Sequence, residues 1–351
     1  MWHSLREEAC TKSVFFARFR VCTRPALVSH MLHKVWSRTY EQSPLSKIMH
    51  QTKGLLIDMD GVIYRENQLL PKAAEFIHHL IETSTPFIFV TNNSAPTPED
   101  LVVKLNHLGI HGISARHFYT AAMNTAEFLA ENHPCCTAFV MGDAGLTLAL
   151  QKAGIPNDSI RPTYVVVGEG MQSTEKLSKA HELIEKGARL VATNPDNWCP
   201  VKKEVTRPGA GALAAYLEAS TGQRAYFLGK PNPYMFQRAR RLLQRHTEEV
   251  MMVGDTMETD IRGAIEVGMQ ACLVLTGSTR IEDLNNYVYQ PTCVLEGVDE
   301  LLEELRGTGT SSSRLQFLSR VTASAQKKPG AKHPDQRSEI PYPRPRPAMT
   351  K

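Results

Sequence analysis

The chain has 351 residues, enough for one large or two modest domains that each bury a core. Its formal charge of +4 is unevenly distributed, because residues 1–50 carry eight basic and three acidic side chains and residues 307–351 carry nine and two. Residues 51–306 therefore carry a net charge of −8. This acidic middle excludes a nucleic-acid-binding core, and no apolar run approaches the roughly 18 residues that a membrane span needs.

Seven cysteines, without C-x-x-C spacing, indicate reduced thiols rather than a disulfide framework or a zinc site. We therefore expect a cytoplasmic protein. Residues 1–50 are expected to be a disordered basic extension; a mitochondrial transit peptide is the alternative, but Glu7 and Glu8 lie where such peptides avoid acids. Residues 307–351, rich in Pro, Ser, Lys and Arg, are expected to be a disordered tail, with binding of a partner or RNA as the alternative.

Apolar strand-like runs alternate with helical periodicity from residue 54 onward, which predicts an α/β fold. The first block comprises strands over 54–58, 86–91 and 118–119 and helices over 71–83, 97–108 (capped by Thr97, with Pro98 first) and 121–131. The second comprises strands over 138–141, 164–167 and 189–192 and helices over 145–153, 173–186 and up to about 220. The third comprises strands over 225–228, 250–253 and 270–275 and helices over 260–267 and 297–305. We expect residues 51–136 and 225–306 to form one Rossmann-like parallel-sheet core, with residues 137–224 inserted as an α/β cap domain.

Four polar motifs follow strand-like runs. In chain order they are Asp58-Met59-Asp60-Gly61, Thr91-Asn92-Asn93-Ser94, Gly229-Lys230-Pro231, and Gly254-Asp255-Thr256-Met257-Glu258-Thr259-Asp260. Residues just beyond the carboxyl ends of parallel strands converge on one crevice. The motifs are therefore expected to share one site for phosphate chemistry.

Asp58 and Asp60 are two carboxylates at one strand end, followed by a glycine that permits a sharp turn. Such a pair suits a division of labour in which one carboxylate attacks phosphorus and the other handles a proton. A plain turn or a fragment of a calcium loop is the alternative. The calcium loop is disfavoured because apolar Val62 and Ile63 stand where its further ligands are needed.

The charges of the motifs indicate a cation. A phosphate monoester is a dianion, and Asp58, Asp255 and Asp260 add three negative charges, so that Mg²⁺ and Lys230 are needed to offset them. The same balance predicts that Asp60 enters catalysis protonated, as general acid. Thr91 and Asn92 offer a hydroxyl and backbone N–H groups to phosphate, although a plain turn before a helix also explains them.

The motifs resemble those of the haloacid dehalogenase superfamily, in its subclass IIA with an α/β cap, and within it the NagD-like nucleotide monophosphatases. The likeness runs over about residues 53–300 and includes the stretches 118–123, 192–196, 211–213 and 229–260. The resemblance implies that Asp58 is the nucleophile and Asp60 the acid and base. It implies phosphate binding by Thr91, Asn92, Asn93 and Lys230, and a Mg²⁺ site of Asp58, the Asp60 carbonyl and Asp255 with Asp260 in support. It also implies that the cap, especially Asn194 to Asp196 and the loop to Gly209, closes over the substrate. The loop 198–203 and the pair Glu169-Gly170 depart from the family pattern.

The sequence thus predicts a Mg²⁺-dependent phosphatase that hydrolyses small phosphomonoesters through an aspartyl-phosphate, with nucleoside 5′-monophosphates such as UMP as substrates. A phosphatase for phosphoglycolate, a sugar phosphate or pyridoxal phosphate is the first alternative. A receiver domain needs only about 120 residues and no cap, and a non-catalytic scaffold does not need the intact acid set. The expected partner is a small molecule, with a homo-oligomer as an option.

Overall fold

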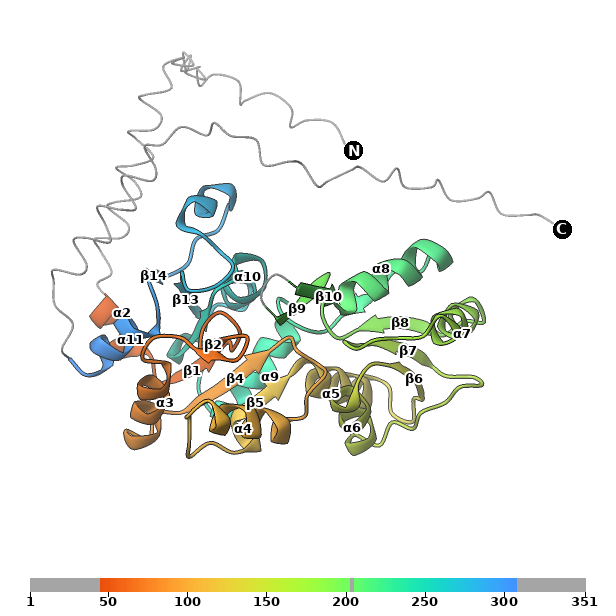
Figure 1. The fold of residues 1–351 in the computed structure, drawn as a ribbon, viewed down its shortest axis with the longest axis horizontal. Coiled ribbons are helices and arrows are strands. Elements are labelled where there is room, and N and C mark those ends of the chain that lie inside the picture. The colour runs from red at the N-terminus through yellow and green to blue at the C-terminus, as the bar shows by residue number, and fades with distance from the viewer. Residues whose placement is uncertain (1–44, 203–204, 308–351) are drawn as a thin grey trace, which may run out of the picture. The chain divides into compact units, whose positions relative to one another are not determined.

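Two parallel β-sheets organise the part of the chain that the computed structural model describes, residues 45–202 and 205–307 (Figure 1). The larger sheet has the order β14-β13-β12-β1-β4-β5, and all neighbours in it are parallel. Its strands are β1 (Gly54–Ile57), β4 (Phe87–Thr91), β5 (Phe118–Thr120), β12 (Val250–Gly254), β13 (Gln270–Val274) and β14 (Cys293–Leu295). The predicted parallel core sheet is confirmed.

Helices cover both faces of this sheet, which explains why its strands are apolar at nearly every position. Alternate residues of β1 and β4 pack against α3 (Ala73–Glu82), α4 (Pro98–His107) and α11 (Val298–Leu305). The opposite face meets α9 (Pro233–Leu243) and α10 (Arg262–Glu266). Thr97 forms a capping box with Asp100 at the start of α4, as expected from a Thr-Pro helix start.

The second sheet has the order β11-β8-β7-β6 and is also parallel. Its strands are β6 (Ala138–Met141), β7 (Tyr164–Val167), β8 (Arg189–Ala192) and β11 (Tyr226–Phe227). One face packs on α7 (Thr174–Glu185) and α8 (Ala210–Thr221), the other on α5 (Ala121–Asn132) and α6 (Ala144–Lys152). This confirms a separate α/β layer inserted between the two parts of the larger sheet.

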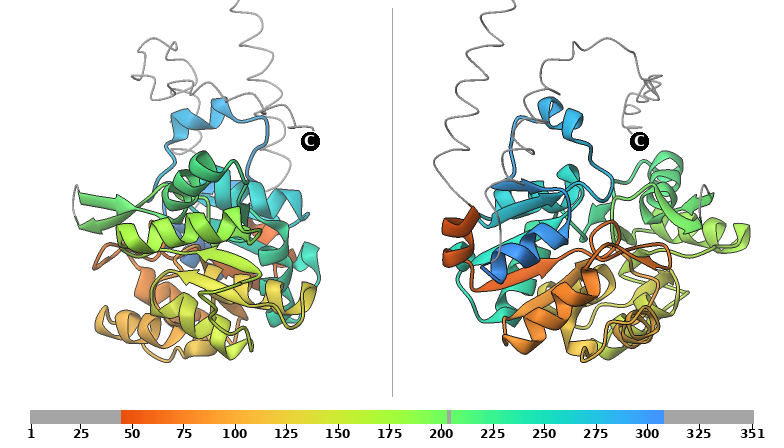
Figure 2. Two further views of the ribbon diagram at one scale, coloured as in Figure 1. Left: turned by 90° about the vertical axis from the view of Figure 1, so that its right-hand side faces the viewer. Right: turned by 60° about the vertical axis from the view of Figure 1, so that its left-hand side comes forward.

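Short elements complete the fold. Two antiparallel hairpins are β2 (Tyr64–Arg65) with β3 (Gln68–Leu69) and β9 (Trp198–Lys202) with β10 (Val205–Pro208). The 3-10 turns are η1 (Ala115–His117), η2 (Thr247–Glu249) and η4 (Ile281–Asn286). The segment around η4, blue in Figure 2, projects from the larger sheet in both views.

Four details differ from the predictions. Helix α2 (Leu45–Gln51) begins within the expected disordered extension, because Ile48 is buried against the core. Strand β11 pairs with β8, so the run before Lys230 belongs to the second sheet. Helix α9 was not predicted, and the expected helix over 260–267 is a π-helical turn, η3 (Met257–Ile261), followed by α10.

The remaining predictions about the ends of the chain, disorder in residues 1–44 and 308–351, lie outside the described residues. The predicted boundaries of core and cap stay predictions. None of the described helices combines the length and apolar character needed to cross a membrane. The five cysteines of the described part are free thiols.

Candidate active site

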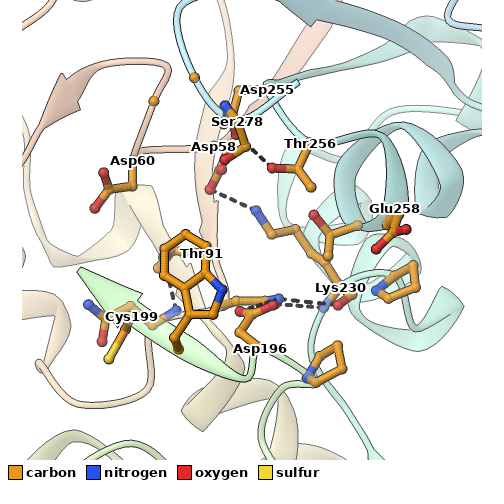
Figure 3. A pocket seen from close by; sticks show the side chains of 18 of the residues that line it. Asp58, Asp60, Thr91, Asp196, Cys199, Lys230, Asp255, Thr256, Glu258 and Ser278 are labelled. Carbon is orange, nitrogen blue, oxygen red and sulfur yellow. Dashed lines mark hydrogen bonds and ion pairs between the residues drawn. The ribbon is translucent and has the colours of Figure 1, made fainter. Parts of the chain in front are cut away.

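The carboxyl ends of both sheets open onto one pocket of about 1110 Å³. Eight of the residues predicted from the sequence line it, namely Asp58, Asp60, Thr91, Asn92, Asn93, Asp196, Lys230 and Asp255 (Figure 3). The larger sheet supplies the residues after β1, β4 and β12, and the second sheet supplies those after β8 and β11. Asn194 and Asp260 are not among the lining residues.

Lys230 is the buried cation of the site, with 2% of the residue exposed. Its Nζ lies 2.7 Å from Oδ1 of Asp58 and 2.7 Å from Oδ1 of Asp260. Burial opposes the charge on Lys230, but the Asp260 and Asp58 carboxylates outweigh burial and raise the pKa of the ammonium. One ammonium thus faces several carboxylates, and negative charge is left in excess.

Three carboxylates form a group that suits a divalent cation. Oxygens of Asp58, Asp255 and Asp260 lie within 4.8 Å of one another. The Ser278 N–H donates to Oδ2 of Asp255 (2.6 Å) and the Thr256 hydroxyl donates to its Oδ1 (3.2 Å), which fixes that carboxylate. A purely oxygen donor set with excess negative charge fits Mg²⁺. The Asp60 carboxylate is not part of this group, and the Asp60 carbonyl as a metal ligand stays a prediction.

Asp60 stands apart from the Asp58–Lys230 pair (Figure 3). Its side chain lines the pocket, and Gly61, with φ +81°, turns the chain directly after it. The loss of water around Asp60, together with the Asp58 charge, raises the pKa of Asp60 to about 6. Lys104 opposes this shift; its Nζ lies 3.7 Å from the ring centroid of Tyr64. A carboxyl with such a pKa keeps its proton to higher pH than an ordinary aspartate.

The loop after β4 is tied to the second sheet. Asn92 Oδ1 accepts from the Lys230 N–H (2.7 Å), and Asn92 Nδ2 donates to Asp196 Oδ2 (3.1 Å). Asn194 Nδ2 donates to the Asn92 carbonyl (2.8 Å). The Asn194 side chain is fully buried, is not among the residues that line the pocket, and holds this loop, so its predicted place over the substrate stays a prediction. Thr91 Oγ1 accepts from the Asn93 N–H (3.1 Å), which shapes the turn.

Comparison with known proteins places this site in a family. A model described as haloacid dehalogenase-like hydrolase matches residues 55–156, and a second, HAD-hydrolase-like model matches residues 227–301. The ribonucleotide monophosphatase NagD of Escherichia coli K12 is 33% identical over 250 residues, 71% of this chain and 98% of NagD. The solved NagD structure superposes with a TM-score of 0.67. The chain belongs to the haloacid dehalogenase (HAD)-like hydrolase family.

Two further relatives show how widely HAD substrates vary. A dihydroxyacetone phosphatase of Corynebacterium glutamicum is 36% identical over 249 residues, 71% of this chain and 90% of the relative. An acid sugar phosphatase of Staphylococcus saprophyticus is 38% identical over 259 residues, 73% of this chain and 99% of the relative. The chain is therefore a HAD-type phosphatase of small phosphomonoesters, and its relatives do not fix the leaving group.

Several residues that line the pocket were not among the site residues predicted from the sequence. They are Tyr64, Glu169, Trp198, Arg207, Ser278, Tyr287 and Tyr289. Glu169 could have been recognised from the sequence, because the Gly168-Glu169-Gly170 stretch follows a predicted strand directly and departs from the family pattern. Trp198 and Arg207 belong to the cap loop up to Gly209 that was expected over the substrate, but neither was singled out within it. Ser278 carried no signal, since it reaches the pocket only through tertiary folding.

Proposed function

We propose that this HAD phosphatase hydrolyses nucleoside 5′-monophosphates such as UMP through an aspartyl-phosphate on Asp58, with Mg²⁺ as cofactor. The observation that carries the mechanism is the position of Lys230, whose Nζ lies 2.7 Å from Asp58 Oδ1 within a buried group of carboxylates. Phosphatases for sugar phosphates, phosphoglycolate or pyridoxal phosphate are the alternatives within the same chemistry.

In the first half-reaction an Asp58 carboxylate oxygen attacks phosphorus and the ester P–O bond breaks. The bonding electrons go to the leaving oxygen, which takes the proton of Asp60. The raised pKa of Asp60 supports this role, because a protonated fraction persists near pH 6. Lys230 offsets charge on the phosphoryl oxygens, and Thr91, Asn92 and Asn93 present a hydroxyl and N–H groups to them.

In the second half-reaction Asp60 takes a proton from water, whose oxygen attacks phosphorus. The bond between phosphorus and Asp58 then breaks, and phosphate leaves with the Asp58 carboxylate restored. Asp58, Asp255 and the Asp60 carbonyl would hold Mg²⁺, with Asp260 supporting them, and the bound ion would supply positive charge to the phosphate. Asp196, fixed by Asn92, bounds the pocket on the side of the second sheet.

The size and lining of the pocket favour a nucleoside as leaving group. About 1110 Å³ is ample for a molecule with a base and a sugar, whereas a triose uses little of it. Trp198 is 61% exposed and lines the pocket, as do Tyr287 and Tyr289, whose ring centroids are 5.4 Å apart. Aromatic faces of this kind stack on nucleobases.

The test is phosphate release from UMP, GMP, glycerol 3-phosphate, 2-phosphoglycolate, pyridoxal phosphate and p-nitrophenyl phosphate, with Mg²⁺ or EDTA. We expect metal-dependent turnover with the nucleotides ranked first, and a loss of at least about 10⁴-fold in Asp58→Asn. Glu258→Gln, on the pocket wall, is the control for a general change of charge. Absence of release from every compound by folded, Mg²⁺-loaded protein would refute the mechanism, and a different ranking would refute only the nucleotide assignment.

A further inference from the structure

Glu169 is a buried carboxylate that the hydrolytic mechanism does not use. It follows strand β7, lines the pocket and is 3% exposed. Its Oε1 accepts from Asn194 Nδ2 at 3.3 Å. Its Oε2 has no hydrogen-bond partner among the described residues and lies 3.7 Å from Nη2 of Arg207, beyond hydrogen-bond distance.

Arg207 brings a cation to the same wall of the pocket. It lies on β10, opposite Cys199 of β9, and its side chain is 32% exposed. The Nε–H group donates to Cys199 Sγ at 3.1 Å, which is the only hydrogen bond of this guanidinium within the described residues. The Nη groups therefore keep donors for an oxygen atom inside the pocket.

Asn194 connects this wall to the phosphate end of the site. The same amide that contacts Glu169 also donates to the carbonyl of Asn92, in the loop that holds phosphate. The ion pair of Arg207 with Glu169, and the Asn194 amide that contacts Glu169, thus link Arg207 to the loop after β4. A side chain at this place can contact the leaving group of a phosphomonoester and so discriminate between substrates.

The net charge around Arg207 selects among possible leaving groups. The carboxylates of Asp143 and Glu169 interact electrostatically with the Arg207 guanidinium, and the Asp196 carboxylate interacts in the same way with that of Glu169. A Cβ on Gly170 would lie 2.2 Å from Asp143 Oδ1, so that carboxylate stands directly beside the Glu169 segment. Two acids, Asp143 and Glu169, against one guanidinium leave the wall negative once Glu169 is ionised. Such a wall repels a carboxylate but still offers N–H donors to a neutral hydroxyl.

We propose that Arg207 is a specificity-determining residue that donates hydrogen bonds to hydroxyl oxygens of a neutral, polyhydroxylated leaving group, and that Glu169 positions it and disfavours leaving groups bearing a carboxylate. This inference rests on the proposed phosphatase function and narrows its substrates to phosphomonoesters of polyols, sugars and nucleosides. It excludes phosphoglycolate as a preferred substrate, because its leaving group bears a carboxylate.

Two substrates of similar size test the proposal. Glycerol 3-phosphate has a neutral, hydroxylated leaving group and 2-phosphoglycolate a carboxylated one, while p-nitrophenyl phosphate has no hydroxyl on its leaving group and reports on the chemistry alone. Assays at pH 8 keep Glu169 mostly ionised, since its pKa is about 7. The wild type is expected to show a kcat/KM at least about tenfold higher for glycerol 3-phosphate than for 2-phosphoglycolate.

Arg207→Ala is expected to lower kcat/KM for glycerol 3-phosphate about tenfold, mainly through KM, with p-nitrophenyl phosphate changed less than about twofold. Arg207→Lys, which keeps the charge, should retain part of the activity. Glu169→Gln should raise the ratio of kcat/KM for 2-phosphoglycolate to that for glycerol 3-phosphate, an effect that a merely structural role would not produce. The matched controls are Arg189→Ala on β8 and Glu185→Gln on α7, which are exposed and do not line the pocket.

A preference of the wild type for 2-phosphoglycolate, or an equal effect of Arg207→Ala on all three substrates in folded protein, would overturn the proposal. An unchanged substrate ratio in Glu169→Gln would overturn the part assigned to Glu169. If p-nitrophenyl phosphate is not hydrolysed even by the Mg²⁺-loaded wild type, the proposed function itself fails.

Discussion

Lys230 and Asp58 are in contact, with Nζ 2.7 Å from Oδ1, although they follow strands of two different sheets. Asp58 follows β1 of the six-stranded sheet, and Lys230 follows β11 of the four-stranded sheet. The ion pair therefore joins the two layers at the centre of the pocket. Because both side chains are buried, each depends on the other for compensation of its charge.

Removal of the Lys230 ammonium should destabilise the fold. In Lys230→Met we expect the free energy of unfolding, measured by urea denaturation in EDTA, to fall by about 3–5 kcal/mol, because buried carboxylates are left unpaired. Adding Asp260→Asn to this variant should recover part of the loss. The control is Lys53→Met, which removes an exposed ion pair with Glu249 and should cost less than about 1 kcal/mol. Equal losses in the two single variants would contradict the central role of Lys230.

Magnesium binding should be visible without turnover. Addition of Mg²⁺ to EDTA-treated protein should raise the Tm, because the ion binds the folded carboxylate group and not the unfolded chain; saturation at 100 times Kd corresponds to about 2.7 kcal/mol. Asp255→Asn should abolish most of the shift, whereas Glu258→Gln, also in the pocket, should preserve it. A shift that persists in full in Asp255→Asn would place the ion elsewhere.

The sequence predicted the parts of the site that follow strands, because strand ends can be recognised from apolar runs. Asp58, Thr91 and Asp255 lie where this reasoning placed them, at the carboxyl ends of β1, β4 and β12. Lys230 was placed in the pocket, but the sheet that delivers it was not foreseen, since a two-residue strand such as β11 has no periodicity of its own.

Side chains whose role depends on the contact between the two layers were harder to predict. The sequence placed Asn194 over the substrate but did not foresee that its side chain is buried and donates to the Asn92 carbonyl. Arg207 reaches the pocket only because β10 folds back on β9. No pattern within one strand encodes such a contact, so the positions at strand ends were predictable one by one, whereas only the cap loop as a whole could be placed at the pocket.

Ser94 should matter for the contact between the layers. Its fully buried hydroxyl accepts from the Glu169 N–H (3.0 Å) and from the Thr193 hydroxyl (3.1 Å). Ser94→Ala leaves two buried donors without an acceptor, and the free energy of unfolding should fall by about 2–3 kcal/mol. Ser159→Ala, at an exposed position, should change it by less than about 0.5 kcal/mol. A neutral Ser94→Ala variant in denaturant unfolding would show that the layers are held together by other contacts.

Trp198 offers a direct probe of the leaving group, since it is the only tryptophan within the described residues. In a Trp2→Phe, Trp36→Phe background carrying Asp58→Asn to prevent turnover, binding of UMP should quench the Trp198 fluorescence through base stacking. Glycerol 3-phosphate at saturation should leave the emission nearly unchanged. Equal quenching by both compounds would argue against stacking, and quenching by neither would remove Trp198 from the nucleoside site.

Glu169 should make stability depend on pH. Burial, followed by the Asp196 charge, raises the pKa of Glu169 from 4.5 to about 7 in the folded state. The folded protein therefore binds this proton more tightly than the unfolded chain, so the stabilisation is complete below pH 4.5 and is lost as pH rises through 7. Relative to Glu169→Gln, the wild type should lose on the order of 3 kcal/mol between pH 4.5 and 7.5.

Glu175→Gln gives the control of opposite sign for this pH dependence. Hydrogen bonds from its own backbone N–H and from Ser173 lower the pKa of Glu175, which is exposed, so its small contribution appears as pH rises and vanishes in acid. Denaturant unfolding of the three proteins from about pH 3 to pH 7.5 separates the two signs, because the contribution of Glu175 is lost only as pH falls below 4.5. If the stability curves of the wild type and Glu169→Gln run parallel from pH 4.5 to 7.5, Glu169 does not retain its proton in the folded state, and the negative wall around Arg207 persists at acidic pH as well.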